Sequence, residues 1–207
     1  MPFDQWMTDP RWIELVRTCM GSIAYDPSSN EVAQEYVKAT TFCVHPDEMD
    51  SWMGYGDCPP DNLKFDGLKQ EWHGNVFCNP PYSAGNIDKF SDKIVSEWKA
   101  KEYMVDQSKH RFVNQMIILV NSANDTKWYQ QLLKYSQATL FVKGRIKFWK
   151  IENGKAWEKW EGVKSKEKKL GKIGNSPRYI NTLFYFGDNI TRFKEVFGDK
   201  GTIMVKA

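Results

Sequence analysis

The sequence predicts an α/β protein, a single domain whose mainly parallel central sheet is flanked by helices. Short apolar segments of strand length alternate along the chain with longer amphipathic segments, which is the order typical of this class. The 207 residues suffice for one full hydrophobic core and leave little room for a second. Hydrophobic residues make up 41% and charged residues 27% of the chain, values that exclude a disordered protein. We therefore expect one domain over residues 1–207.

Residues typical of helix ends and turns, together with the spacing of apolar residues, predict the helices and strands. Asp9-Pro10 and Gly21 bound an amphipathic helix, because Pro suits the first helical turn and Gly the position after the last. A strand over 22–25 and a turn over 26–30 precede a helix over 31–39, and residues 40–68, rich in Pro and Gly, are expected to be irregular. The later elements are a strand over 75–78, a helix over 87–101, a buried strand over 115–120, a helix capped by Asp125, a strand over 139–148 and a strand over 182–186 that closes the sheet.

The positive charge of the chain is concentrated in one segment. The net charge is only +3, but residues 143–178 hold twelve Lys and Arg and four acidic residues, a net charge of +8. The other residues therefore carry −5. Such a segment predicts either a surface that faces a polyanion such as nucleic acid or a solvated, charged loop.

The sequence predicts neither a metal site nor a membrane span. Cys19, Cys43, Cys58 and Cys78 show no metal-ligand spacing with one another or with histidine, so we expect four reduced structural thiols. The longest apolar run, 116–120, is far too short to cross a bilayer. No secretory segment is visible, and a soluble, cytoplasmic protein is expected.

The most informative motif is Asn79-Pro80-Pro81-Tyr82. Two prolines cannot continue a central strand, so the motif is a rigid loop at the carboxyl end of the strand before it, the edge where open α/β sheets bind ligands. Backbone carbonyls and the Asn79 side chain are acceptors that suit a planar amino group with two N–H donors. Tyr82 offers a face on which a planar base can stack. The alternative is a purely structural Pro-Pro turn before a helix.

This motif resembles the catalytic signature of S-adenosylmethionine-dependent amino methyltransferases that act on adenine-N6, and of some that modify glutamine or other planar amides. More of the chain resembles the small DNA N-6-adenine-methyltransferase (Dam) family common in phages. The blocks that carry this resemblance run in order along the chain, and they are Trp6-x-Thr8, 26–30, 66–68 with Trp72, 79–83, 125–128, 143–148 and 175–177. Their ordered combination is specific, although each block except the Pro-Pro block is weak alone.

The resemblance implies a Rossmann-like methyltransferase with S-adenosylmethionine as its cofactor and DNA as its partner, in the host-cell cytoplasm if a phage encodes it. The implied cofactor contacts are Trp6, Thr8, Asp26, Pro27, Ser28, Asp66, Gly67 and Leu68. The implied catalytic residues, which hold the target base, are Asn79, Pro80, Pro81 and Tyr82.

One departure from the methyltransferase pattern concerns the cofactor turn. Methyltransferases at large have a glycine-rich loop after the first strand, and this sequence has Ser28-Ser29-Asn30 there. A simple helix N-cap is therefore the alternative for Asp26.

The basic segment is expected to hold DNA. Lys143, Arg145 and Lys147 alternate along the predicted strand over 139–148 and so share one face. A basic flap over about 150–178 is expected to cover the duplex, with a lysine-rich solubilising hairpin as the alternative. The predicted nucleic-acid-binding residues are Lys143, Arg145, Lys147, Lys166, Lys168, Lys169, Lys172 and Arg178.

These residues lead to a hypothesis about the reaction, site-specific transfer of a methyl group from S-adenosylmethionine to the amino group of a flipped adenine in DNA. Hydrogen bonds from that amino group to the Asn79 side chain and the Pro80 carbonyl make its nitrogen more pyramidal and reactive, and positioning carries much of the rate. Three alternatives stay open. They are the same chemistry on RNA or a protein amide, a catalytically silent nucleic-acid-binding module of the same fold, and a host-protein interaction factor.

Overall fold

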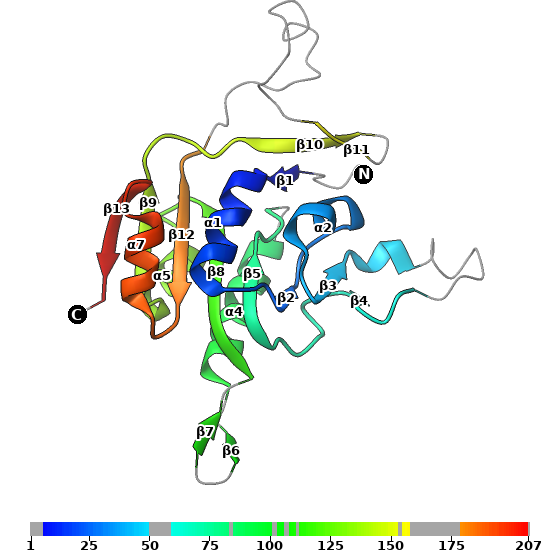
Figure 1. Ribbon diagram of the computed structural model, residues 1–207, viewed down its shortest axis with the longest axis horizontal. Coiled ribbons are helices and arrows are strands. Elements are labelled where there is room, and N and C mark those ends of the chain that lie inside the picture. Colours follow the sequence, from blue (N-terminus) through cyan, green and yellow to red (C-terminus); the bar gives the residue numbers. More distant parts are fainter. Residues whose placement is uncertain are drawn as a thin grey trace, which may run out of the picture.

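An eight-stranded sheet forms the centre of the protein (Figure 1). The computed structural model describes residues 6–49, 59–82, 85–100, 103–105, 108–110, 112–152, 155–157 and 179–206. From one edge of the sheet to the other, its strands are β13 (Gly201–Val205), β9 (Ala138–Val142), β12 (Asn181–Phe186), β8 (Val113–Asn121), β5 (Gly74–Cys78), β2 (Tyr25–Asp26), β3 (Thr41–Val44) and β4 (Leu63–Phe65).

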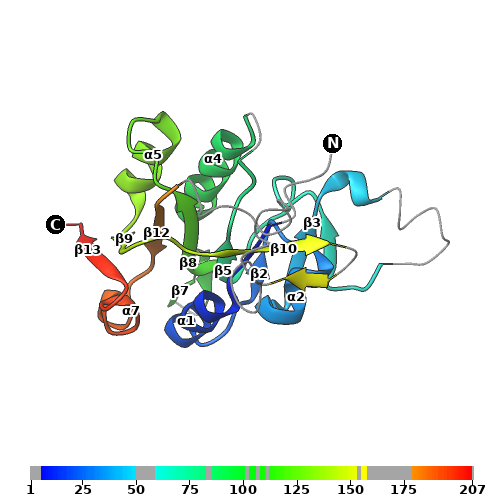
Figure 2. The same cartoon turned by 90° about the horizontal axis from the view of Figure 1, so that it is seen from above.

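Helices cover both faces of this sheet. They are α1 (Pro10–Met20), α2 (Glu31–Val37), α4 (Asn86–Lys99), α5 (Lys127–Tyr135) and α7 (Ile190–Phe197), and a 3-10 turn, η1 (Pro46–Glu48), follows β3. Figure 2 shows α1, α2 and α7 on one face and α4 and α5 on the other. Each face has its own hydrophobic core, and the neighbours Leu183 and Phe184 on β12 are buried in different ones. Alternate residues of a strand therefore supply the two cores.

The sheet is mixed, which corrects the prediction of a mainly parallel one. β4, β3, β2, β5 and β8 pair in parallel, whereas β12 pairs antiparallel with β8 and β9, and β13 antiparallel with β9. Val142 ends β9 and Asn181 begins β12 at the same edge of the sheet, so β12 must run back between its neighbours. β12 was predicted to close the sheet, but it lies inside because it pairs with β8 on one side and with β9 on the other, and β13 forms the edge.

The order of the parallel strands reverses between β2 and β5. β2, β3 and β4 extend the sheet in one direction, and β5 and β8 extend it in the other. Loops that leave the carboxyl ends of the two strands at such a point diverge to opposite faces, and ligands of open α/β sheets bind between them. Residues 26–30 and 79–82 leave the sheet at this reversal point.

A second, three-stranded antiparallel sheet lies across the carboxyl-end edge of the parallel strands (Figures 1 and 2). It consists of β1 (Trp6–Thr8), β10 (Phe148–Glu152) and β11 (Lys155–Trp157), with β10 in the centre. A separate hairpin, β6 (Tyr103–Val105) and β7 (Ser108–His110), precedes β8. The small sheet brings the N-terminal strand and the segment after β9 to the reversal point.

The predicted elements agree with the structure where an apolar pattern repeats over several helical turns, and they differ where the elements are short. The first three predicted helices are confirmed as α1, α2 and α4. Residues 40–68, predicted irregular, contain the 3-10 turn η1 and the strands β3 and β4. These strands have four and three residues, too few to show an alternating pattern. Thr126 rather than Asp125 is the N-cap of α5. The strand predicted over 139–148 is two strands, because the chain turns at Gly144 with φ 84°.

Candidate functional site

Asn79-Pro80-Pro81-Tyr82, here called the base loop, leaves the carboxyl end of β5. Asn79 Nδ2 donates a hydrogen bond of 3.3 Å to Oγ1 of Thr8, which is 4% exposed at the end of β1. Asn79 Oδ1 is buried and has no hydrogen-bond partner in the described part of the chain. A buried acceptor without a donor is costly, and in native proteins such a group marks a place where a ligand or water supplies the donor.

Tyr82 anchors the other end of the base loop. Its hydroxyl oxygen accepts a hydrogen bond of 2.6 Å from the backbone N–H of Asn121, the last residue of β8. Burial raises the pKa of Tyr82 well above its usual value, so the hydroxyl stays neutral. The half-buried ring packs against the core on the α4 and α5 face. The hydroxyl thus holds the loop to the end of β8, and the predicted stacking of a base would involve the ring alone.

Two asparagines missed by the sequence analysis continue this anchor towards β9. Asn181 Nδ2 donates to Asn121 Oδ1 at 3.2 Å, and Asn181 Oδ1 accepts from the backbone N–H of Ile146 at 3.1 Å. Asn181 is fully buried. A chain of buried and partly buried hydrogen bonds therefore connects the base loop with the turn between β9 and β10. No sequence signal pairs these residues, because they lie on separate elements 60 and 35 positions apart.

Asp26 lies at the end of β2, on the other side of the reversal point. It is 3% exposed, and its carboxylate accepts hydrogen bonds from the Ser28 N–H at 3.3 Å and from Gln34 Nε2 at 3.1 Å. Burial raises its pKa from 3.8 to about 7. The N-cap of α2 is Asn30, whose Oδ1 accepts from the Ala33 N–H at 2.8 Å, so the N-cap alternative for Asp26 is wrong.

The segment Asp66-Gly67-Leu68 packs directly on the turn that follows Asp26. A Cβ atom at Gly67 would lie 2.0 Å from the carbonyl oxygen of Pro27, so only glycine allows this approach. The Gly67 carbonyl accepts a hydrogen bond of 2.8 Å from Trp72 Nε1, and Trp72 is fully buried. Asp66 has φ 56°, and its Oδ1 accepts from the Leu68 N–H at 3.2 Å. Two of the three predicted cofactor segments are therefore neighbours.

The predicted basic strand face is wrong, because Lys143, Arg145 and Lys147 lie in the turn between β9 and β10. Lys143 and Arg145 are exposed and Lys147 is half-buried, while Ile146 between them is 1% exposed. The buried Ile146 and its hydrogen bond to Asn181 hold this basic turn against the edge of the sheet that carries the base loop. Two cations still face solvent there.

Some predicted residues fall outside the described part of the chain. They are Lys166, Lys168, Lys169, Lys172 and Arg178, together with the side chain of Trp6. Of the predicted flap, the structure describes the backbone of 150–152 and 155–157, which belongs to β10 and β11.

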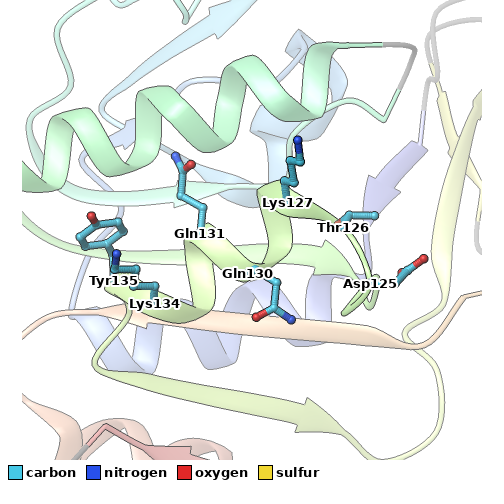
Figure 3. A pocket seen from close by; sticks show the side chains of 7 residues that line it. All are labelled: Asp125, Thr126, Lys127, Gln130, Gln131, Lys134 and Tyr135. Carbon is cyan, nitrogen blue, oxygen red and sulfur yellow. The ribbon is translucent and has the colours of Figure 1, made fainter.

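A surface hollow of about 420 Å³ lies elsewhere, along α5 (Figure 3). Its lining residues are Asp125, Thr126, Lys127, Gln130, Gln131, Lys134 and Tyr135. Lys127 and Gln131 point towards α4, where Gln131 donates to Asp92 at 2.9 Å. None of the predicted catalytic or cofactor residues lines this hollow, so it is separate from the base loop.

The described residues contain neither a cluster of metal ligands nor a membrane-spanning helix. No three His, Cys, Asp or Glu side chains gather there as metal ligands do. No helix in the described ranges is long and apolar enough to cross a bilayer.

Fold and site together define an α/β protein with a candidate ligand site at the reversal point of its sheet, between an Asn-Pro-Pro-Tyr loop and a buried carboxylate. A family model described as DNA N-6-adenine-methyltransferase (Dam) matches residues 62–173, just over half of the chain. The chain belongs to this family of DNA adenine methyltransferases, as its sequence blocks predict. The match contains the base loop and the basic turn and begins after Thr8 and Asp26. A comparison with curated proteins finds none that matches the chain.

Proposed function

We propose that this protein transfers the methyl group of S-adenosylmethionine to the N6 amino group of an adenine taken out of the DNA stack. The observation that carries the proposal is Asn79 Oδ1, a buried acceptor that lacks a donor among the described residues, beside Pro80 at the reversal point. An adenine amino group supplies such a donor. Membership of the family supports methylation of adenine, and the order of the parallel strands supports a single Rossmann-like domain.

The residues at the reversal point fit S-adenosylmethionine. Asp26 is a buried carboxylate whose hydrogen-bond donors in the described chain, among them Ser28 and Gln34, are neutral. A ligand with an ammonium or sulfonium group brings the positive charge that offsets the burial of this carboxylate. The segment 66–68, which packs on the turn after Asp26, completes the proposed cofactor contacts. When bound, S-adenosylmethionine supplies the methyl group as an electrophile.

The base loop prepares the adenine for attack. Asn79 Oδ1 and the Pro80 carbonyl accept hydrogen bonds from the two amino N–H groups, which draws the nitrogen out of conjugation with the ring and frees its lone pair. The nitrogen that takes the methyl group then loses one of its protons to solvent. The proline rings and the bond from Asn121 to the Tyr82 hydroxyl hold the loop, so that little reorganisation is needed during reaction. The adenine must arrive flipped or single-stranded, because it cannot reach the loop inside a duplex.

The positive surface supports nucleic acid as the substrate. Lys143 and Arg145 are exposed at the same edge of the sheet as the base loop, and the segment that they begin carries a net charge of +8. We propose that they contact phosphates and orient the strand, together with the predicted lysines that lie outside the described residues.

The test is transfer of isotope-labelled methyl groups from S-adenosylmethionine to DNA, RNA and a glutamine-containing peptide, followed by analysis of the modified nucleosides. We expect N6-methyladenine in DNA alone. Asn79→Ala should abolish transfer, while calorimetry shows that it binds S-adenosylmethionine like the wild type. Label in RNA or peptide alone, or full turnover of DNA by Asn79→Ala, would contradict the proposal. A wild-type protein that binds DNA but no S-adenosylmethionine would instead be the catalytically silent module.

A further inference from the structure

We infer that Thr8 is a positioning residue that holds the Asn79 carboxamide with its oxygen towards the adenine. This inference rests on the proposed function and assigns Thr8 a role different from the cofactor contact that the resemblance implies. Two observations carry it. Asn79 Nδ2 donates to Thr8 Oγ1, and Asn79 Oδ1, at the other end of the same amide, is the buried acceptor without a partner in the described chain.

The two ends of a carboxamide have opposite chemistry. The oxygen accepts hydrogen bonds and the nitrogen donates two, so a half-turn about the last side-chain bond replaces an acceptor by donors. Donors facing an adenine amino group repel it, and only the orientation with Oδ1 towards the adenine is useful. In that orientation the Asn79 nitrogen faces the protein and needs an acceptor, because a buried N–H without one is costly. Thr8 Oγ1 is that acceptor at 3.3 Å.

Thr8 can do this because its own position is fixed on both sides. In β1 it stands opposite Phe148 of β10. The next residue, Asp9, is the N-cap of α1 and accepts from the Arg11 N–H at 2.9 Å. A β-branched side chain also has few rotamers, so the hydroxyl has little freedom. The strand partner β10 continues from the basic turn, so the strand that supports Thr8 also continues from the turn expected to contact DNA.

The experiment compares Thr8→Val, which keeps the shape and removes the hydroxyl, with Thr8→Ser, which keeps the hydroxyl. With saturating cofactor, we expect Thr8→Val to lower kcat on DNA about tenfold, the rate equivalent of one hydrogen bond, without a change in KM for DNA. Thr8→Ser should restore kcat to within about twofold of wild type, and the Kd for S-adenosylmethionine should be unchanged in both. Thr202→Val, on the exposed edge strand β13, is the matched control.

Two outcomes would overturn the inference. One is a weaker Kd for S-adenosylmethionine with kcat retained at saturation, which would assign the hydroxyl to the cofactor. The other is an unchanged kcat in Thr8→Val.

A second measurement does not depend on activity. In protein labelled with ¹⁵N at asparagine side chains, solvent exchange of the Asn79 Nδ2 protons should be faster in Thr8→Val than in wild type or Thr8→Ser. Equal exchange rates in all three would also overturn the inference. If the wild type transfers no methyl group to DNA, the proposed function fails, and this measurement still decides whether Thr8 holds Asn79.

Discussion

Asp26 obtains its chemistry from where it is buried. An exposed aspartate is ionised at neutral pH, but burial raises the pKa of Asp26 to about 7. The free protein therefore holds this carboxyl in both protonation states near neutrality. A cationic ligand favours the ionised state, so the proposed binding of S-adenosylmethionine implies linked proton release at Asp26.

This linkage predicts how cofactor affinity depends on pH. Between pH 5.5 and 7.5 the affinity for S-adenosylmethionine should rise as Asp26 ionises, by up to about tenfold per pH unit below 7 and less above it. Asp26→Asn should bind more weakly at pH 7.5 and show almost no pH dependence. Calorimetry at three pH values measures the affinity of both proteins for S-adenosylmethionine. If Asp26→Asn keeps the pH dependence of the wild type, another group is responsible for it.

In the free protein, stability should depend on pH in the opposite direction from cofactor affinity, so the free energy of unfolding should fall as pH rises. Because the folded-state pKa of Asp26 lies above its ordinary value of 3.8, the protonated form stabilises the fold, and this contribution is lost as pH rises towards about 7. Denaturant titrations without cofactor should show this decline in wild type and a flatter profile in Asp26→Asn.

At the scale of elements, the basic turn between β9 and β10 shows how one backbone angle changes the presentation of charge. Alternating Lys143, Arg145 and Lys147 predict a strand face, but the left-handed φ of Gly144 ends β9 and starts a turn. Ile146 is buried under this turn and leaves the flanking Lys143 and Arg145 exposed. The turn therefore presents these cations together at the edge of the sheet, whereas a strand would have spread them along one of its faces.

If this turn contacts phosphates, its charges must appear in the salt dependence of DNA binding. Lys143→Gln with Arg145→Gln should reduce the slope of log affinity against log salt by about 2, roughly one for each lost phosphate contact. Lys194→Gln, exposed on α7, should leave it unchanged. The predicted flap is tested separately by replacing Lys166, Lys168, Lys169 and Lys172. A variant pair with the wild-type slope would show that the turn does not touch DNA.

At the scale of the whole molecule, the mixed sheet is what joins the parts of the site. Because β12 returns between β8 and β9, Asn181 at its start lies beside the ends of both strands. Its side chain bonds to Asn121 and to the Ile146 N–H, and Asn121 holds Tyr82. A purely parallel sheet would have no strand beginning at this edge.

Asn181 should therefore contribute strongly to stability. Asn181→Leu leaves the buried Ile146 N–H and the partly buried Asn121 Oδ1 without their partner, and we expect the free energy of unfolding to fall by about 2–4 kcal/mol. Asn124→Leu, at an exposed position of the turn after β8, should change it by less than about 0.5 kcal/mol. Urea denaturation measures both. Equal free energies of unfolding for the two variants would show that the hydrogen bonds of Asn181 make no net contribution to stability.

Several features of the protein follow from the sequence by itself. The helices α1, α2 and α4 follow from periodicity and end signals, and the base loop follows from two prolines after a strand. The ordered blocks predict the family that the match to residues 62–173 bears out. Each of these depends on residues close together in the chain, whose conformational preferences and chemistry act without the rest of the fold.

Only the tertiary structure decided the direction of β12, the turn at Gly144 and the contact between Thr8 and Asn79. Thr8 and Asn79 are 71 positions apart, and they meet because the small sheet lies across the edge where β5 ends. The pKa of Asp26 and the need for glycine at position 67 likewise arise from packing against distant segments. Burial, hydrogen bonding across elements and strand direction are properties of the packed chain, since no local pattern specifies which surfaces meet.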